Sequence, residues 1–233
     1  MTRRQFFVAG TDTGVGKTYV AALLLRAFAA QGKTTLGLKP VAAGCTPTTG
    51  GLRNDDALAL IAASTVKLPY AQVNPVALVA PVAPHIAAAQ ENRRLRVAQL
   101  AGLVRGATLQ GRADITLVEG AGGWRVPLNE GETLADLARE LQLPVILVVG
   151  LRLGCLNHAL LSARAIRADG CELLGWIGNR IDPDMLEPDG NLDTLRARLP
   201  APCLGVIDYR ADAASAARAL APAVAALRSC VQR

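Results

Sequence analysis

The chain has 233 residues, of which 51% are hydrophobic, 19% charged and 3% aromatic. This length suits one α/β domain over residues 1–233, and the apolar content excludes a disordered chain. No apolar run approaches the ~20 residues that cross a bilayer, and the scarcity of aromatic rings argues against a stacking surface for single-stranded nucleic acid. The net charge of +6 comes from 21 arginines and four lysines without a charged block. We therefore expect neither a membrane nor nucleic acid as a partner.

Five cysteines are scattered along the chain, and none has the CxxC spacing of a zinc or redox site. An odd, dispersed set favours reduced thiols over a disulfide framework. The apolar stretch Phe6–Ala9 is too short for the core of a signal peptide and runs into a glycine-rich turn. These features indicate a cytoplasmic protein.

Short apolar strands alternate with helical segments along the chain. In chain order we expect strand Gln5–Ala9, helix Lys17–Ala30, strand Thr35–Lys39, helix Asp55–Ala63, a proline-rich loop Asn74–Pro84, helix Val97–Gln110, strand Ile115–Glu119, helix Thr133–Leu141, strand Val145–Gly150, helix Leu156–Ala168, strand Leu173–Gly178, helix Leu192–Leu199, strand Leu204–Ile207 and a closing helix Ala211–Leu227. Continuous apolar strands are typical of a sheet covered on both faces. The pattern predicts a doubly wound, three-layer α/β/α sandwich with a mostly parallel sheet.

The first strand leads into Gly10-Thr11-Asp12-Thr13-Gly14-Val15-Gly16-Lys17-Thr18, and a helix starts at once. Backbone N–H groups of such a turn and the helix N-terminus can hold a phosphate chain, with Lys17 for the outer phosphates and the Thr18 hydroxyl for Mg²⁺. Five residues separate Gly10 from Gly16, so Thr11 takes the usual first-glycine position. We expect nucleotide binding and a sheet of the P-loop NTPase type.

Mg²⁺ is a hard ion that prefers oxygen ligands, and carboxylates stand at the end of one strand and at the start of one helix. Glu119 closes a buried strand and is followed by Gly120-Ala121-Gly122-Gly123, while Asp56 opens a helix. Lys39 ends the second strand just before Pro40, at the same carboxyl edge as the phosphate loop. We expect Thr18, Asp56 and Glu119 to hold the metal and Lys39 to hold an anion.

The chain resembles one family closely, the dethiobiotin synthetases, ATP-dependent carboligases of biotin synthesis. The segments that carry this resemblance are the phosphate loop, Lys39-Pro40-Val41-Ala42-Ala43-Gly44, Leu52-Arg53-Asn54-Asp55-Asp56-Ala57-Leu58, Pro84-His85-Ile86-Ala87-Ala88, Val118-Glu119-Gly120-Ala121-Gly122-Gly123-Trp124, Pro144–Gly150, Leu153-Gly154-Cys155-Leu156-Asn157-His158-Ala159 and Gly175-Trp176-Ile177-Gly178-Asn179. They follow in order over nearly the whole chain.

The resemblance implies closure of a cyclic urea on 7,8-diaminononanoate with CO₂, ATP and Mg²⁺. One amine becomes a carbamate, a carbamate oxygen attacks the γ-phosphate, and the second amine displaces phosphate from the mixed anhydride. The resemblance assigns Lys39, Lys17 and Thr13 to catalysis. It assigns nucleotide or metal contacts to Thr13, Gly14, Val15, Gly16, Lys17, Thr18, Tyr19, Asp56, Glu119, Gly120, Ala121, Gly122, Asn179, Arg180, Asp208, Tyr209 and Arg210.

The diamine contacts implied by the resemblance fall on two segments. Lys39 and Ala43 would meet the reacting end, and Gly154, Cys155 and Asn157 would bind the carboxylate tail across a homodimer interface. A helix N-terminus suits a carboxylate. Gly14, Ala43 and Asp208-Tyr209-Arg210 depart from residues common in the family, an acidic residue, a serine and a Pro-aromatic pattern respectively.

Two other classes of protein share some of these features. A nucleotide-dependent switch, related to partitioning ATPases or metal-insertion GTPases, would use the same sheet and loop but gives no reason for Lys39. A nucleic-acid-binding module is suggested by charge alone. Asn179-Arg180-Ile181-Asp182 also echoes a guanine-reading motif, which leaves GTP as an alternative to ATP.

Overall fold

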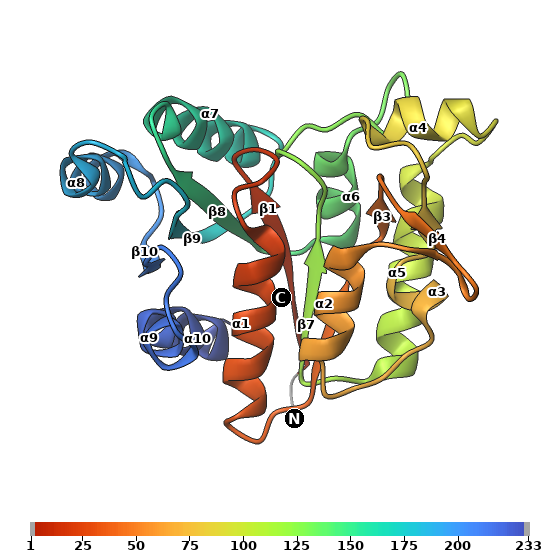
Figure 1. Ribbon diagram of the computed structural model, residues 1–233, viewed down its shortest axis with the longest axis horizontal. Helices are drawn as coiled ribbons and strands as arrows, with labels where there is room; N and C mark the ends of the chain where they lie inside the picture. Colours follow the sequence, from red (N-terminus) through yellow and green to blue (C-terminus); the bar gives the residue numbers. More distant parts are fainter. Residues whose placement is uncertain (1–2, 231–233) are drawn as a thin grey trace.

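The computed structural model describes residues 3–230, so five residues of the expected 1–233 domain lie outside the described part. A parallel sheet of six strands forms the centre, in the order β10-β9-β8-β1-β7-β2 (Figure 1). These strands are β1 (Arg4–Gly10), β2 (Thr35–Leu38), β7 (Ile115–Glu119), β8 (Val145–Leu151), β9 (Leu173–Arg180) and β10 (Cys203–Ile207).

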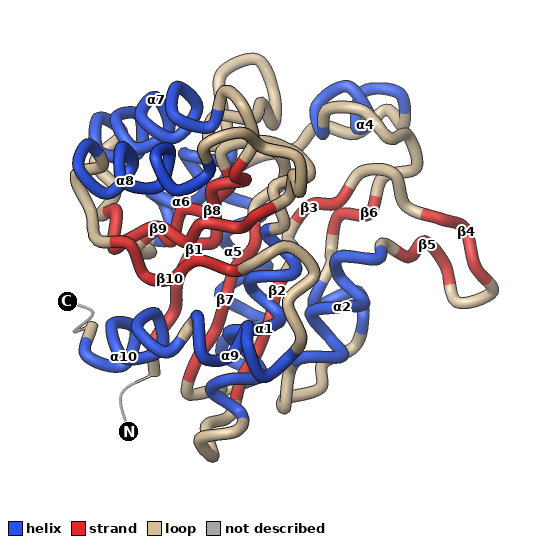
Figure 2. Tube along the Cα trace, turned by 60° about the vertical axis from the view of Figure 1, so that its left-hand side comes forward, coloured by secondary structure: helices blue, strands red, loops and turns tan. Residues whose placement is uncertain are grey.

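Helices cover both faces of this sheet (Figure 2). One face carries α1 (Lys17–Ala29), α2 (Asp55–Ala63), α9 (Ala213–Ala219) and α10 (Ala221–Ser229), and the other carries α5 (Val97–Gly111), α6 (Leu134–Leu141), α7 (Cys155–Ala168) and α8 (Pro188–Arg198). Successive β1 side chains enter opposite cores, with Phe6 and Val8 on the α1 side and Phe7 and Ala9 on the α5 side. Both faces of the strands must therefore be apolar, which confirms the doubly wound three-layer prediction.

The long connection between β2 and α5 holds more structure than its sequence predicts. It contains β3 (Val41–Ala42), β4 (Thr46–Thr48), β5 (Gly51–Arg53), α3 (Tyr70–Val73), β6 (Val76–Ala77) and α4 (Pro84–Gln90). The predicted loop Asn74–Pro84 is wrong at two places, because β6 pairs with β3 and Pro84 begins α4. Proline suits a first helical turn, where its missing N–H needs no partner.

The prediction of one closing helix over Ala211–Leu227 is also wrong, because α9 ends at Ala219 and α10 starts at Ala221. Pro222 lies in the first turn of α10, and inside a continuous helix its ring would clash with the carbonyl four residues earlier. Other boundaries shift modestly: α8 begins at Pro188, α7 at Cys155, and β9 runs on to Arg180. No helix within residues 3–230 is long and apolar enough to cross a membrane.

The strand order reverses beside β1, which lies between β7 and β8. Parallel strands end at the same edge, so the turn after β1, the end of β7 and the end of β2 come together there. Ligands of open parallel sheets bind at such a reversal point.

We expect two glycine substitutions to have opposite effects on stability. Gly205 in β10 has φ 154°, and a Cβ there would lie 2.3 Å from the Ala219 carbonyl oxygen, so Gly205→Ala should lower the free energy of unfolding by about 2 kcal/mol. Gly102, exposed within α5, has open space around its Cβ position, so Gly102→Ala should raise it by about 0.5–1 kcal/mol. Urea unfolding measures both, and equal stability of the two variants would contradict this packing.

Candidate active site

The turn after β1 is shaped by its glycines and by a side chain from β9. Gly16, the residue before α1, has φ 89°, and a Cβ there would lie 2.2 Å from Asn179 Nδ2. Asn179 is buried and donates from Nδ2 to the Val15 carbonyl at 3.0 Å. Asn179 therefore fixes the loop against the end of β9, and the first N–H groups of α1 have no partner within the helix. This arrangement suits a phosphate chain.

Lys17 is nearly buried beside this loop. Its Nζ donates to the Asp12 carbonyl at 3.0 Å and to the Gly122 carbonyl at 2.7 Å. Burial lowers the pKa of Lys17 to about 8, and the nearby charge of Lys39 adds to the lowering. Among the described residues the Lys17 ammonium hydrogen-bonds only neutral carbonyls, so an anion in the loop would stabilise it further.

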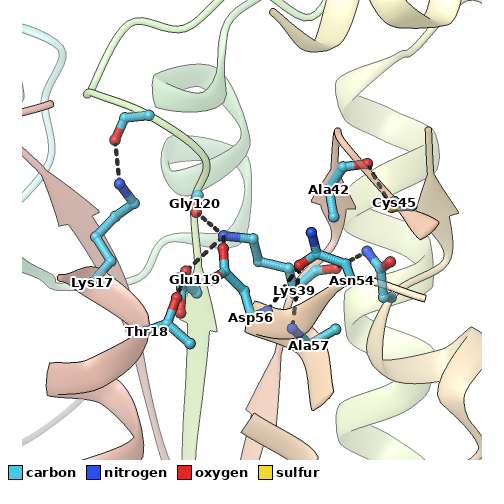
Figure 3. A network of polar contacts seen from close by, with 12 residues as sticks. Lys17, Thr18, Lys39, Ala42, Cys45, Asn54, Asp56, Ala57, Glu119 and Gly120 are labelled. Carbon is cyan, nitrogen blue, oxygen red and sulfur yellow. Dashed lines mark hydrogen bonds and ion pairs between the residues drawn. The ribbon is translucent and has the colours of Figure 1, made fainter. Parts of the chain in front are cut away.

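Lys39 is 3% exposed and uses its ammonium on three partners. Nζ lies 2.6 Å from Glu119 Oε1 and 2.9 Å from Asp56 Oδ2, and it donates to the Gly120 carbonyl at 3.0 Å (Figure 3). Burial alone would lower the pKa of Lys39, but the two carboxylates outweigh it and raise that pKa. For Asp56, burial alone would raise the pKa, but the positive charge of Lys39 outweighs burial, and the pKa of Asp56 is lowered. The three groups form a mutually dependent ion cluster.

Sheet register explains why these residues meet. Leu38 of β2 pairs with Val118 of β7, so Lys39, the residue after β2, stands beside Glu119, the last residue of β7. Asp56 comes from the first turn of α2, which Asn54 caps by accepting from the Asp56 and Ala57 N–H groups. Three separate segments thus converge on one ammonium.

A hard cation fits the oxygen atoms around Glu119. Thr18 Oγ1 donates to Glu119 Oε1 at 2.8 Å, and Glu119 Oε2 is buried without a hydrogen-bond partner among the described residues. The described part of the chain contains no group of three or more His, Cys, Asp or Glu side chains that could hold a metal. Mg²⁺ commonly uses one or two carboxylates together with water and substrate phosphates, so Thr18, Glu119 and Asp56 fit such a shared site.

A cavity of about 850 Å³ opens beside the loop and the ion cluster. Its charged lining residues are Asp12, Lys17, Lys39 and Asp56, and an apolar wall faces them. The wall consists of Ala42, Ala43, Pro81, Val82, Ala83, Pro84, Ala121 and Val126. Sequence reasoning assigned no role to residues 81–84 or to Asp12. For residues 81–84, the only feature of the sequence that could have indicated a cavity wall was an apolar run inside a proline-rich segment.

The chain matches known proteins over most of its length. A family profile described as "AAA domain" matches residues 4–217. An ATP-dependent dethiobiotin synthetase BioD of Cellvibrio japonicus is 59% identical over 226 residues, covering 95% of this chain and 98% of that protein. The protein of the same name from Pseudomonas aeruginosa PAO1 is 55% identical, covering 91% and 92%. The chain belongs to the dethiobiotin synthetase family.

Solved structures with lower identity agree on the fold of this family member. The septum site-determining protein MinD complexed with Mg-ADP, from Pyrococcus horikoshii, is 19% identical with a TM-score of 0.56, and the match covers 96% of this chain and 95% of that one. Chloroplast FtsY from Physcomitrella patens is 20% identical with a TM-score of 0.53, covering 95% and 66%. At such identities the likeness shows the fold alone, and it confirms the P-loop NTPase type of sheet.

A second group of predicted nucleotide contacts lies at the ends of β9 and β10. Arg180 pairs with Asp208 at 3.2 Å and with Asp189 at 2.7 Å. The guanidinium of Arg210 lies 5.2 Å from the centre of the Tyr209 ring. Tyr19, in the first turns of α1, donates to the Ala211 carbonyl at 3.4 Å. Of these residues only Tyr19 lines the cavity in the described chain, so the group extends from the edge of the phosphate loop to a surface outside the cavity.

The predicted diamine contacts are split in the same way. Lys39 and Ala43 line the cavity, together with Thr13, which was assigned to catalysis. Gly154, Cys155 and Asn157 lie at the start of α7, outside the lining, where Gly154 has φ 95° and Cys155 is buried. Burial raises the pKa of the Cys155 thiol, and Asn157 is exposed. Within one chain, the two parts of the predicted diamine site remain apart.

We expect Lys39→Met to destabilise the protein, because it leaves the buried Glu119 carboxylate without its counter-charge. The free energy of unfolding should fall by about 3 kcal/mol or more in urea, measured without ligands. Adding Glu119→Gln to this variant should recover part of the loss, because the uncompensated charge is then gone.

Lys67→Met is the matched control. Lys67 is exposed, and within residues 3–230 it donates only to the Ile61 carbonyl, so this change should alter the free energy of unfolding by no more than about 0.5 kcal/mol. Equal stability of the Lys39 and Lys67 variants would contradict the ion cluster.

Proposed function

We propose that this chain, acting as a single domain, closes the ureido ring of dethiobiotin on 7,8-diaminononanoate with CO₂ and ATP. One observation carries the proposal: the ammonium groups of Lys17 and Lys39 reach the Gly122 and Gly120 carbonyls of one segment beside the cavity. A chain with this arrangement is 59% identical to a protein named as an ATP-dependent dethiobiotin synthetase. The reaction needs cations at this place, because a carbamate and a triphosphate repel each other.

The proposed steps follow from this charge arrangement. One amine of the substrate adds to CO₂ and loses a proton, which gives a carbamate. A carbamate oxygen then attacks the γ-phosphorus, and the bond from that phosphorus to ADP breaks. The second amine attacks the carbon of the mixed anhydride, inorganic phosphate leaves, and the ring closes. Lys17 holds the outer phosphates and Lys39 faces the carbamate, so both lysines lower the repulsion between the two anions.

Thr18, Glu119 and Asp56 are the residues that we propose to hold Mg²⁺ with the phosphates. When bound, the ion supplies positive charge that neutralises phosphate oxygens. Thr18 and Lys17 are adjacent on α1, so the chain presents a hydroxyl and an ammonium to neighbouring phosphates. Positioning of this kind accounts for most of the catalysis expected in phosphoryl transfer.

The nucleotide base lies, in our proposal, against the group formed by Tyr19, Asn179, Arg180 and Asp208–Arg210. Asn179 already donates one N–H to the loop through Val15 and keeps a second N–H and its oxygen for a ligand. An amide offers both a donor and an acceptor, as the edge of adenine requires. We therefore propose ATP as the nucleotide, with Asp182 outside the base contacts.

The tail of the diamine binds, in our proposal, to the start of α7 of a second copy. Gly154 and Asn157 are exposed there, and Leu153 is 91% exposed. Leu161 is 58% exposed and lies one helical turn after Asn157, on the same face. An apolar surface around a predicted binding element favours burial against a partner. The five free cysteines of the described chain support a reducing compartment, the cytoplasm.

We expect phosphate release that depends on every reactant. Wild-type protein mixed with the diamine, bicarbonate, Mg²⁺ and ATP should release phosphate, and omission of any one component should abolish it. Lys17→Ala should lower the rate about 100-fold or more, because a cation at the transferring phosphoryl group is lost. Lys67→Ala is the control and should match wild type. Phosphate release without the diamine would instead indicate an ATPase switch.

We expect two inactive variants to complement each other if the site is shared between copies. In a mixed dimer of Lys39→Ala and Asn157→Ala chains, one site has both defects and the other has neither. Activity should therefore rise when the two proteins are unfolded together and refolded as a mixture. Activity no higher than the sum of the separate variants would rule out the shared site, and sedimentation of each variant checks that dimers form.

A further inference from the structure

The proposed substrate and two of the side chains that line the cavity are all basic. The diamine brings two basic amines into a space that Lys17 and Lys39 line. Like charges at close range oppose binding, so a carboxylate should face the amine end of the substrate. This inference rests on the proposed function and concerns which residue supplies that carboxylate.

Asp12 is the lining carboxylate that the Lys39 cluster does not use. The other lining carboxylate, Asp56, is paired with Lys39 at 2.9 Å, and Glu119 is buried behind it. The Asp12 side chain is 43% exposed and belongs to the loop residue next to Thr13, which also lines the cavity. Its carboxylate is therefore open to solvent on a loop that lines the cavity.

The Asp12 carboxylate is held in place from two sides. Oδ1 accepts from the Thr13 N–H at 2.7 Å, and Oδ2 accepts from Arg152 Nη2 at 2.6 Å. The Asp12 carbonyl also accepts from Lys17 Nζ. A carboxylate offers about four acceptor positions, so two remain for a ligand.

A negative side chain in a phosphate-binding loop carries a cost. It repels the triphosphate, and the Arg152 ion pair offsets only part of this repulsion because both partners are nearly half exposed. The bond from the Thr13 N–H needs no charge, because an asparagine oxygen would accept it equally well. In the described chain the charge serves only the half-exposed Arg152 pair, and it has a further use if a cationic ligand binds beside it.

We propose that Asp12 is a substrate-binding residue that accepts hydrogen bonds from the amine end of the diamine. The carboxylate holds the amine that is not carboxylated, next to Thr13 and across the cavity from Lys39. Arg152 is a positioning residue that fixes the carboxylate from behind. Selectivity for a diamine over a monoamine then depends on Asp12.

Asp12→Asn tests this directly, since it removes the charge and keeps the oxygen for the Thr13 N–H. The KM for the diamine should rise about tenfold or more, while the KM for ATP stays unchanged or falls. Calorimetric titration of the diamine without ATP should show the same loss. The wild-type preference for the diamine over 7-aminononanoate and 8-aminononanoate should shrink by a similar factor.

Several outcomes would overturn the inference. A diamine KM within twofold of wild type means that Asp12 does not bind the amines. An ATP KM that rises in step with the diamine KM means that Asp12 only shapes the loop. Asp193→Asn is the control, because Asp193 pairs only with Arg196 on the surface of α8 in the described chain, and both KM values should stay at wild type. If wild-type protein shows no diamine-dependent phosphate release, the proposed function fails first and this inference fails with it.

Discussion

The buried ammonium of Lys39 is the constraint on which the site depends. A charge in the protein interior requires opposite charges and hydrogen bonds around it, or the fold loses several kcal/mol (about 3–5). Glu119, Asp56 and the Gly120 carbonyl meet that requirement from the end of β7 and the start of α2. The same contacts hold the carboxylates that suit Mg²⁺ beside a lysine that lines the cavity. Stability and the chemistry that we propose therefore depend on one cluster.

The segment after β7 determines how the two lysines stand relative to each other. Figure 3 shows Lys17 and Lys39 on opposite sides of the Glu119–Gly120 backbone, in agreement with the place of β7 between β1 and β2. The far end of this segment is anchored as well, because Trp124 Nε1 donates to Asp169 Oδ2 at 2.7 Å. Asp169 caps the end of α7, and Asn157 lies in the first turn of the same helix. The segment after β7 is therefore anchored to the helix that carries Asn157.

The same architecture serves proteins of other function, as the likeness to MinD and FtsY shows. The sheet and phosphate loop provide a place for a nucleotide, and they do not select a reaction. On neighbouring segments this chain carries a lysine after β2, an acidic residue at the end of β7, and the apolar wall of residues 81–84. The ring-closing reaction that we propose for this chain draws on all three.

Local sequence patterns were enough to predict the strands of the central sheet, most helices and the phosphate loop. Apolar runs, glycines and the Lys17-Thr18 pair act over a few residues, so their meaning is readable without the fold. The placement of Lys39 and Glu119 at strand ends also predicted a shared edge. Strands of two residues, such as β3 and β6, are too short to show a period, and the break before α10 depended on one proline.

Only the tertiary structure decided which distant residues touch. The pairing of Asp12 with Arg152 spans 140 residues, and the cluster of Lys39 with Glu119 spans 80. Such contacts follow from strand order and register, since a shift of one residue along a strand would turn each side chain to the opposite face. The sequence by itself determined that a nucleotide-binding α/β sheet would form and which chemical groups would stand at its edge. The fold alone determined how those groups are paired and which of them are buried, because both depend on strand order and register.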